Sequence, residues 1–158
     1  MKFFLSSFRL GNNPQQFTDL FSDNKKVAVI VNAWDVYPDS DRRQIGIQRE
    51  IDALQQIGLL PELLDLRIYF AKSVSLKEKL IEFGGVWVTG GNTFVLRRSF
   101  KESGFDQWLF EQKTNNNFVY GGYSAGVCVL SANLKNIELM DEPHVNPAGY
   151  RPGVIWEG

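Results

Sequence analysis

The sequence predicts an α/β protein with a mostly parallel sheet and helices on both faces of that sheet. Apolar runs of strand length alternate with segments of helical periodicity along the chain. Residues 27–31 are all apolar, which is typical of a strand covered on both faces, as in a parallel sheet. Strands that alternate with helices connect through right-handed crossovers, so a ligand is expected at the carboxyl ends of the strands.

In the first half of the chain we expect three strands and two helices. Pro14 suits the first position of a helix that Asn13 caps. Apolar residues at mostly helical spacing from Ile45 to Ile57 predict the longest helix, which ends at Gly58, a natural helix C-cap. The expected strands cover residues 2–7, 27–31 and 63–66, and the first helix covers residues 15–21.

The second half is expected to continue this alternation. Ser75 can cap a helix, and Glu78 can complete a capping box with it. The asparagine-rich residues 113–117 predict an exposed turn. The expected strands lie at residues 85–88, 118–120, 136–140 and 153–156, and the expected helices at residues 75–83, 94–100, 105–110 and 127–130.

Composition indicates one domain without a metal or disulfide. The 158 residues are 44% apolar and carry a formal net charge of −1, which gives no electrostatic preference for nucleic acid or membranes. A single cysteine and a single histidine supply neither a disulfide nor a Cys/His metal cluster, and no cofactor is expected. The chain shows neither a secretory leader nor an apolar run of membrane-spanning length, so we expect a cytoplasmic protein.

A serine at a sharp turn is the most informative feature. The segment Gly122-Tyr123-Ser124-Ala125-Gly126 follows a predicted strand and precedes a predicted helix. Such a turn presents the serine hydroxyl at the edge of a sheet and needs small neighbours, because its backbone is strained. It also aims the Ala125 amide at an oxyanion formed there. The alternative is a small-residue turn that only packs a helix closely on its strand.

A second glycine-rich turn follows the strand predicted at residues 85–88. Gly90 or Gly91 could supply an amide N–H that completes a two-donor oxyanion hole with Ala125. Asn92 is a candidate for substrate binding, with the alternative that it caps the next helix. Trp34, at the carboxyl end of the strand at residues 27–31, could line a substrate pocket or belong to the core.

A serine nucleophile needs a base, which is usually a histidine oriented by a carboxylate. His144 is the single histidine, and Asp141 or Glu142 could orient its imidazole. The alternative is a solvated histidine in a proline-bounded loop. Cys128, one helical turn after Ser124, is expected to be a small core residue, and the Arg97–Arg98 pair is expected on a solvated helix face.

These motifs resemble the peptidase E (aspartyl dipeptidase) and cyanophycinase-like serine peptidase family over nearly the whole chain. The matching segments are Gly90-Gly91-Asn92-Thr93, Gly122-Tyr123-Ser124-Ala125-Gly126 and Asp141-Glu142-Pro143. The resemblance implies a flavodoxin-like fold, related to class I glutamine amidotransferase domains, and cleavage after an N-terminal aspartate or at β-aspartyl bonds. It also implies that Ser124 is the nucleophile, Asp141 the triad carboxylate, and Ala125 with Gly90 or Gly91 the oxyanion hole.

The chain departs from the family at the histidine. In the family this residue lies on a strand that the chain begins at residues 153–156, so the resemblance implies a C-terminally truncated domain, and His144 does not match the family position. We therefore expect a serine peptidase whose partner is a small peptide, with no nucleic acid or membrane partner and with a homodimer left open. The alternative is a non-catalytic binding or interaction module that lacks the triad histidine.

Overall fold

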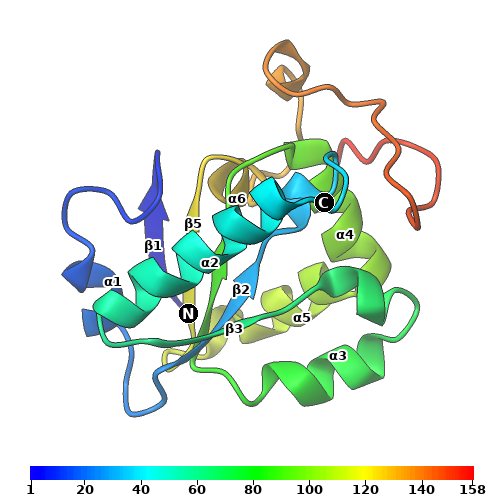
Figure 1. Cartoon of the computed structure of the whole chain (residues 1–158). Coiled ribbons are helices and arrows are strands. Elements are labelled where there is room, and N and C mark those ends of the chain that lie inside the picture. Colours follow the sequence, from blue (N-terminus) through cyan, green and yellow to red (C-terminus); the bar gives the residue numbers. More distant parts are fainter.

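The computed structural model describes residues 1–158 and contains one parallel sheet of five strands (Figure 1). The strand order is β1-β5-β4-β2-β3, and every neighbouring pair is parallel. The predicted fold class is therefore confirmed. The strands are β1 (Lys2–Ser6), β2 (Lys26–Ile30), β3 (Leu60–Leu63), β4 (Gly85–Val88) and β5 (Val119–Tyr123).

Helices cover both faces of this sheet, as predicted, because successive residues of the central strands point to opposite sides. In β2, Val27 and Val29 pack on the side of α1 (Gln15–Asp19) and α2 (Asp41–Gln56). Ala28 and Ile30 pack on the other side. The helices of that second face are α3 (Ser73–Leu80), α4 (Thr93–Ser103), α5 (Phe105–Glu111) and α6 (Ala125–Cys128).

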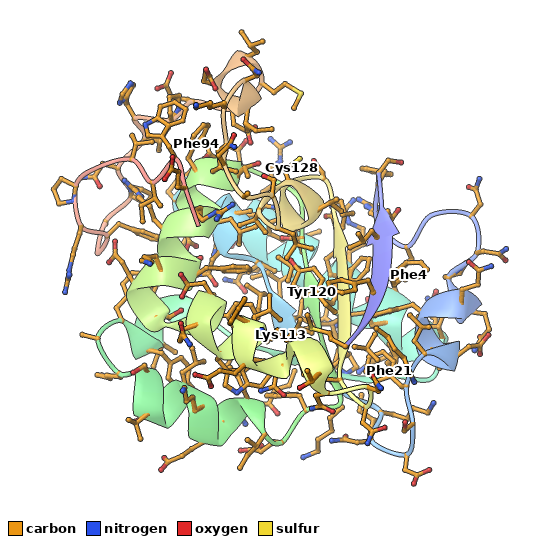
Figure 2. All side chains as sticks on the ribbon, turned by 180° about the vertical axis from the view of Figure 1, so that it is seen from behind. Phe4, Phe21, Phe94, Lys113, Tyr120 and Cys128 are labelled. Atoms are coloured by element: carbon orange, nitrogen blue, oxygen red, sulfur yellow. The ribbon has the colours of Figure 1, made fainter.

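The two central strands β4 and β5 are buried along their whole length. Figure 2 views the face covered by α4 and α5 and shows Tyr120 in the middle of the molecule. This tyrosine is fully buried, and its hydroxyl donates a 2.6 Å hydrogen bond to the carbonyl oxygen of Gly126 in α6. This hydrogen bond therefore attaches α6, the short helix after β5, to the core of the sheet.

No helix is both long enough and apolar enough to cross a membrane.

Two predicted elements in the middle of the chain are displaced. The third strand covers Leu60–Leu63 instead of residues 63–66, and a 3₁₀ helix, η2 (Leu66–Tyr69), follows it. The Asp65 side chain accepts the Arg67 amide N–H and thereby begins this turn. Helix α3 begins at Ser73 with Lys72 at its N-cap, so the prediction that Ser75 caps this helix was wrong.

The two strands predicted near the end of the chain are absent. Residues 136–140 contain a 3₁₀ helix, η4 (Ile137–Leu139), because Asn136 has a φ of 72°, which a strand does not accommodate. Residues 153–156 form a loop in which Gly153 has a φ of 132°. One isolated bridge between Asn133 and Glu157 is the only sheet-like pairing in this region. Residues 129–158 lie beside α4 at the carboxyl edge of the sheet (Figure 1).

Candidate active site

Ser124 lies at the apex between β5 and α6, as the sequence predicted. Its φ of 51° and ψ of −114° are unusual for a residue with a side chain. The Val127 and Cys128 amides donate hydrogen bonds of 2.8 and 2.9 Å to the Ser124 carbonyl oxygen, and they hold the first turn of α6 in place. The residue is exposed, although all of β5 before it is buried. The turn therefore carries a hydroxyl from the core to the surface.

The glycines beside Ser124 are required by the close packing of this turn. A Cβ added to Gly126 would lie 2.3 Å from the carbonyl oxygen of Val88 in β4. A Cβ added to Gly122 would lie 3.0 Å from the carbonyl oxygen of Gly126. The contact at Gly126 is shorter than a side chain tolerates and the contact at Gly122 is tight, so glycines let α6 rest directly on the sheet.

The Gly90 turn lies against Ser124. A Cβ on Gly90 would be 3.0 Å from the Ser124 Cβ, which places the two glycine-rich turns side by side at the carboxyl edge. Gly91 has a φ of 137° and packs against the Ala33 carbonyl oxygen. The amide N–H groups of Gly91 and Ala125 make no hydrogen bond to another group of the chain.

Asn92 and Asp141 together cap helix α4. The Asn92 Oδ1 atom accepts the Val95 amide N–H at 2.9 Å, and its Nδ2 atom donates to the Glu142 carbonyl oxygen at 2.9 Å. The Thr93 amide donates to Asp141 Oδ2 at 2.8 Å. These bonds bring the segment around Asp141 to the Gly90 turn, and they give Asn92 the capping role considered as the alternative.

The charge of Asp141 also acts on Cys128 in α6. Burial and the negative charge of Asp141 raise the pKa of the Cys128 thiol. Cys128 is half-buried in α6, and Figure 2 shows it at the same end of the molecule as Phe94 in the first turn of α4. The Asp141 carboxylate therefore binds the N-terminal end of α4, and its charge acts on Cys128 in α6.

His144 is not oriented by either candidate carboxylate. Its side chain is exposed, and its imidazole makes no hydrogen bond within the chain. The His144 backbone amide donates to Glu142 Oε1 at 2.9 Å, which only shapes the loop. The structure thus brings Ser124, Gly90, Gly91, Ala125, Asn92 and Asp141 to one edge and leaves His144 on the surface.

The family described as Peptidase family S51 matches residues 7–152 of the chain. The chain belongs to peptidase family S51. The resemblance to peptidase E predicted from the sequence is thereby confirmed at the level of the family. This match covers both glycine-rich turns and Asp141, so the S51 chain contains every site residue considered above.

Two uncharacterized peptidases of Listeria are similar to this S51 chain. Lmo0363 of Listeria monocytogenes is 36% identical over 89 residues, which are 56% of this chain and 42% of the relative. Lin0382 of Listeria innocua is 33% identical over 91 residues, 58% of this chain and 42% of the relative. The aligned part of the chain thus spans about two fifths of the curated relatives that it matches.

Two solved structures share the fold of the S51 chain. A crystal structure of a candidate peptidase E protein from Listeria monocytogenes EGD-e superposes with a TM-score of 0.70 at 32% identity, over 90% of this chain and 68% of that one. A peptidase from an acI-B1 actinobacterium superposes with a TM-score of 0.68 at 17% identity, over 87% of this chain and 59% of that one. The second likeness shows the fold alone.

A buried polar network beside Trp34 was missed by the sequence analysis. Trp34 is half-buried in the 3₁₀ helix η1 (Asn32–Trp34) at the carboxyl end of β2. The next residue, Asp35, is buried and binds Arg43 Nη2 at 2.6 Å, Asn32 Nδ2 at 2.7 Å and the Tyr150 hydroxyl. Polar residues directly after an all-apolar strand are the sequence signal that could have pointed to this cluster.

The sequence analysis also missed Glu50, which binds the side chain of Tyr123 next to the serine turn. Glu50 is buried and accepts hydrogen bonds from Trp87 Nε1 at 2.9 Å and from the Tyr123 hydroxyl at 3.2 Å. Burial and the Glu50 charge raise the pKa of Tyr123, which directly precedes Ser124. A carboxylate in the apolar stripe of α2, between Ile47 and Leu54, was the available signal.

The expectation that Arg97 and Arg98 face solvent was wrong. Both residues are buried, because residues 131–158 pack over α4. Arg97 Nη2 donates to the Ser131 carbonyl oxygen at 2.6 Å, and Arg98 Nη1 donates to that of Gly153 at 2.7 Å. The two guanidinium groups therefore hold the C-terminal segment of the S51 chain and do not face the Gly90 turn.

Proposed function

We propose that Ser124 is the nucleophile of a serine peptidase of the peptidase E type, acting on small peptides with an N-terminal aspartate. The observation that carries this proposal is the exposed hydroxyl on a strained turn whose close neighbour is the Gly90 turn. Membership of peptidase family S51 supports the class of reaction. We infer a cytoplasmic location, because a single cysteine offers no internal disulfide.

In the proposed reaction the Ser124 oxygen attacks the carbonyl carbon of the scissile peptide bond. The proton of the hydroxyl passes through a base to the leaving amine, and the carbon–nitrogen bond breaks to leave an acyl ester on Ser124. Water then hydrolyses this ester and restores the serine. The free amides of Ala125 and Gly91 would stabilise the oxyanion of each step, and each such donor is worth about 3 kcal/mol of the barrier.

Asp141 is the proposed triad carboxylate. Its Oδ2 atom accepts the Thr93 amide N–H, and its Oδ1 atom makes no hydrogen bond within the chain, which leaves one oxygen for an imidazole. His144 lies three residues further on and is the single histidine of the 158 residues, so it is our candidate for the base. It would have to turn toward Ser124 to act.

A second candidate function is a non-catalytic binding module. One observation favours it: the imidazole of His144 is bound neither to Asp141 nor to Glu142, so no oriented base accompanies the nucleophile. Such a module would keep the exposed serine and the free amides and would bind a peptide without cleaving it.

Covalent labelling by a fluorophosphonate tests the nucleophile. We expect the wild-type chain to be labelled, the Ser124→Ala variant not to be labelled, and the matched variant Ser22→Ala, which changes an exposed loop serine, to behave as wild type. Intact mass locates the adduct. Labelling retained without Ser124 would overturn the proposal, and a folded wild type that is never labelled would favour the binding module.

Hydrolysis of an aspartyl anilide against a leucyl anilide tests the substrate class. The proposal predicts turnover selective for aspartate that falls at least about a thousandfold in Ser124→Ala, because that variant lacks the nucleophile. His144→Ala should lose turnover equally if His144 is the base. Unchanged activity in that variant would remove His144 from the mechanism while leaving Ser124 in place.

A further inference from the structure

A cavity of about 430 Å³ opens between the turn after β2 and the first half of α2. Its walls include Trp34 on one side and Arg42, Arg43 and Arg49 on the other. Three of its lining residues are thus arginines, and no aspartate or glutamate lines the cavity. The proposed reaction does not use this cavity, although it lies at the same edge of the sheet as Ser124.

Only one of the three arginines of this cavity is paired with carboxylates. Arg42 and Arg49 lie two helical turns apart, and neither guanidinium has a carboxylate within 4.0 Å. Arg43 is buried and pairs with Asp35 at 2.6 Å and Asp39 at 3.3 Å, yet its Nη1 atom has no partner. A buried guanidinium donor without an acceptor costs free energy that a bound anion would recover.

An aromatic wall completes the cavity. A Cβ added to Gly46 would lie 3.3 Å from the Trp34 ring, so the glycine lets the indole lie close against α2 between Arg42 and Arg49. The half-buried ring gives the site a flat apolar surface beside two free cations. This combination suits a small organic carboxylate better than a bare inorganic ion.

The position of the cavity fits the length of a short peptide. The Ser124, Gly91 and Trp34 turns follow β5, β4 and β2, which are neighbours in the sheet. Two strand spacings separate β5 from β2, or about 10 Å, which is the span of about three extended residues. The Asn92 amide donates to the Ala33 carbonyl oxygen at 2.9 Å, so the turns are directly joined.

We propose that the cavity of Trp34, Arg42, Arg43 and Arg49 binds a carboxylate of the peptide whose carbonyl group lies at Ser124. The inference rests on the proposed function and assigns it a subsite. The carboxylate comes either from an acidic side chain or from the C-terminus of the peptide. In both cases Arg42 and Arg49 supply charge-assisted hydrogen bonds, while Trp34 packs against the aliphatic part.

Direct binding tests this subsite without requiring turnover. We would titrate the dipeptide Asp-Leu by calorimetry into the Ser124→Ala variant, with and without the double substitution Arg42→Gln and Arg49→Gln. The proposal predicts a Kd that is about tenfold larger in the double variant. The matched control is Arg151→Gln, which removes the charge of an exposed arginine outside the cavity and should leave the Kd unchanged.

Two analogues distinguish the sources of the carboxylate. If the arginines bind the aspartate side chain, Asn-Leu will bind weakly, with the same Kd for Ser124→Ala with and without the double substitution. If the arginines bind the C-terminus, Asp-Leu amide will instead bind weakly, with the same Kd for these two proteins. An unchanged Kd for Asp-Leu in the double variant overturns the subsite. That result is distinct from a failure of the proposed function, which would appear as fluorophosphonate labelling that does not depend on Ser124.

Discussion

Ser124 combines a backbone conformation that serine rarely adopts with an exposed hydroxyl. Conformations of this kind cost about 1–3 kcal/mol and persist only where the surroundings impose them. Here the hydrogen bonds of the Val127 and Cys128 amides and the close contact of Gly126 with Val88 impose it. The sequence predicted this strained turn between a strand and a helix correctly, because the small residues that the turn requires are adjacent to Ser124 in the chain.

At the same scale, the reactivity of the Cys128 thiol reports the effect of the Asp141 charge. Burial and this charge raise the thiol pKa, and only the thiolate reacts with iodoacetamide. Asp141→Asn removes the negative charge, so the Cys128 pKa should fall and alkylation at pH 8 should become faster. The measurement is the alkylation rate of the folded protein between pH 7 and 10.

Glu138→Gln is the matched control for this prediction. It removes a carboxylate from an exposed position on the same segment and should leave the rate profile of Cys128 unchanged. Equal profiles for wild type and Asp141→Asn would contradict the effect of the Asp141 charge on the Cys128 pKa.

At the scale of the elements, Asp35 joins three parts of the chain. It binds Asn32 in η1, Arg43 in α2 and Tyr150 in the C-terminal segment. Asp35→Asn would leave the buried Arg43 guanidinium without its main counter-charge, and we expect the free energy of unfolding to fall by about 3 kcal/mol. Urea denaturation followed by tryptophan fluorescence measures the change.

Asp39→Asn tests whether burial of the ion pair causes the large loss of stability expected for Asp35→Asn. Asp39 pairs with the same Arg43 at 3.3 Å, but its side chain is 69% exposed, so its loss should cost less than about 1 kcal/mol. Similar costs for the two substitutions would show that the Asp35 network adds little to stability.

The elements that the sequence placed correctly are those with a complete local pattern. Strand β2 is apolar after Lys26, β4 is apolar throughout, and α4 begins at a capping Asn92, so each could be recognised alone. Strand β3 was displaced because Leu60 and Leu63 are exposed on an edge strand, while the apolar Leu64 and Leu66 after it are buried. Its bounds depend on pairing with β2, which the segment itself does not specify.

At the scale of the whole molecule, the sheet and the C-terminal segment differ in how many of their side chains are buried. The central strands are buried on both faces, whereas residues 131–158 contain only two buried side chains, Leu134 and Tyr150. Amides of β2, β4 and β5 should therefore exchange with deuterium slowest, and those of residues 139–149 fastest, because local opening there exposes little apolar surface.

Hydrogen exchange read by mass spectrometry checks this order. The helix α4 provides an internal reference, because it is buried but lies beside the C-terminal segment. Protection of residues 139–149 equal to that of β4 would show that the segment opens only with the whole fold.

The sequence by itself determined the α/β alternation, the serine turn, the Gly90 turn and the resemblance to peptidase E, because each depends on neighbouring positions. Only the tertiary structure decided that Asp141 caps α4, that Arg97 and Arg98 are buried, and that an arginine-lined cavity lies two strands from Ser124. The first two features join residues far apart in the chain, and the separation of the cavity from Ser124 depends on the order of the strands. They follow from the strand order and the path of residues 131–158, which no local pattern encodes.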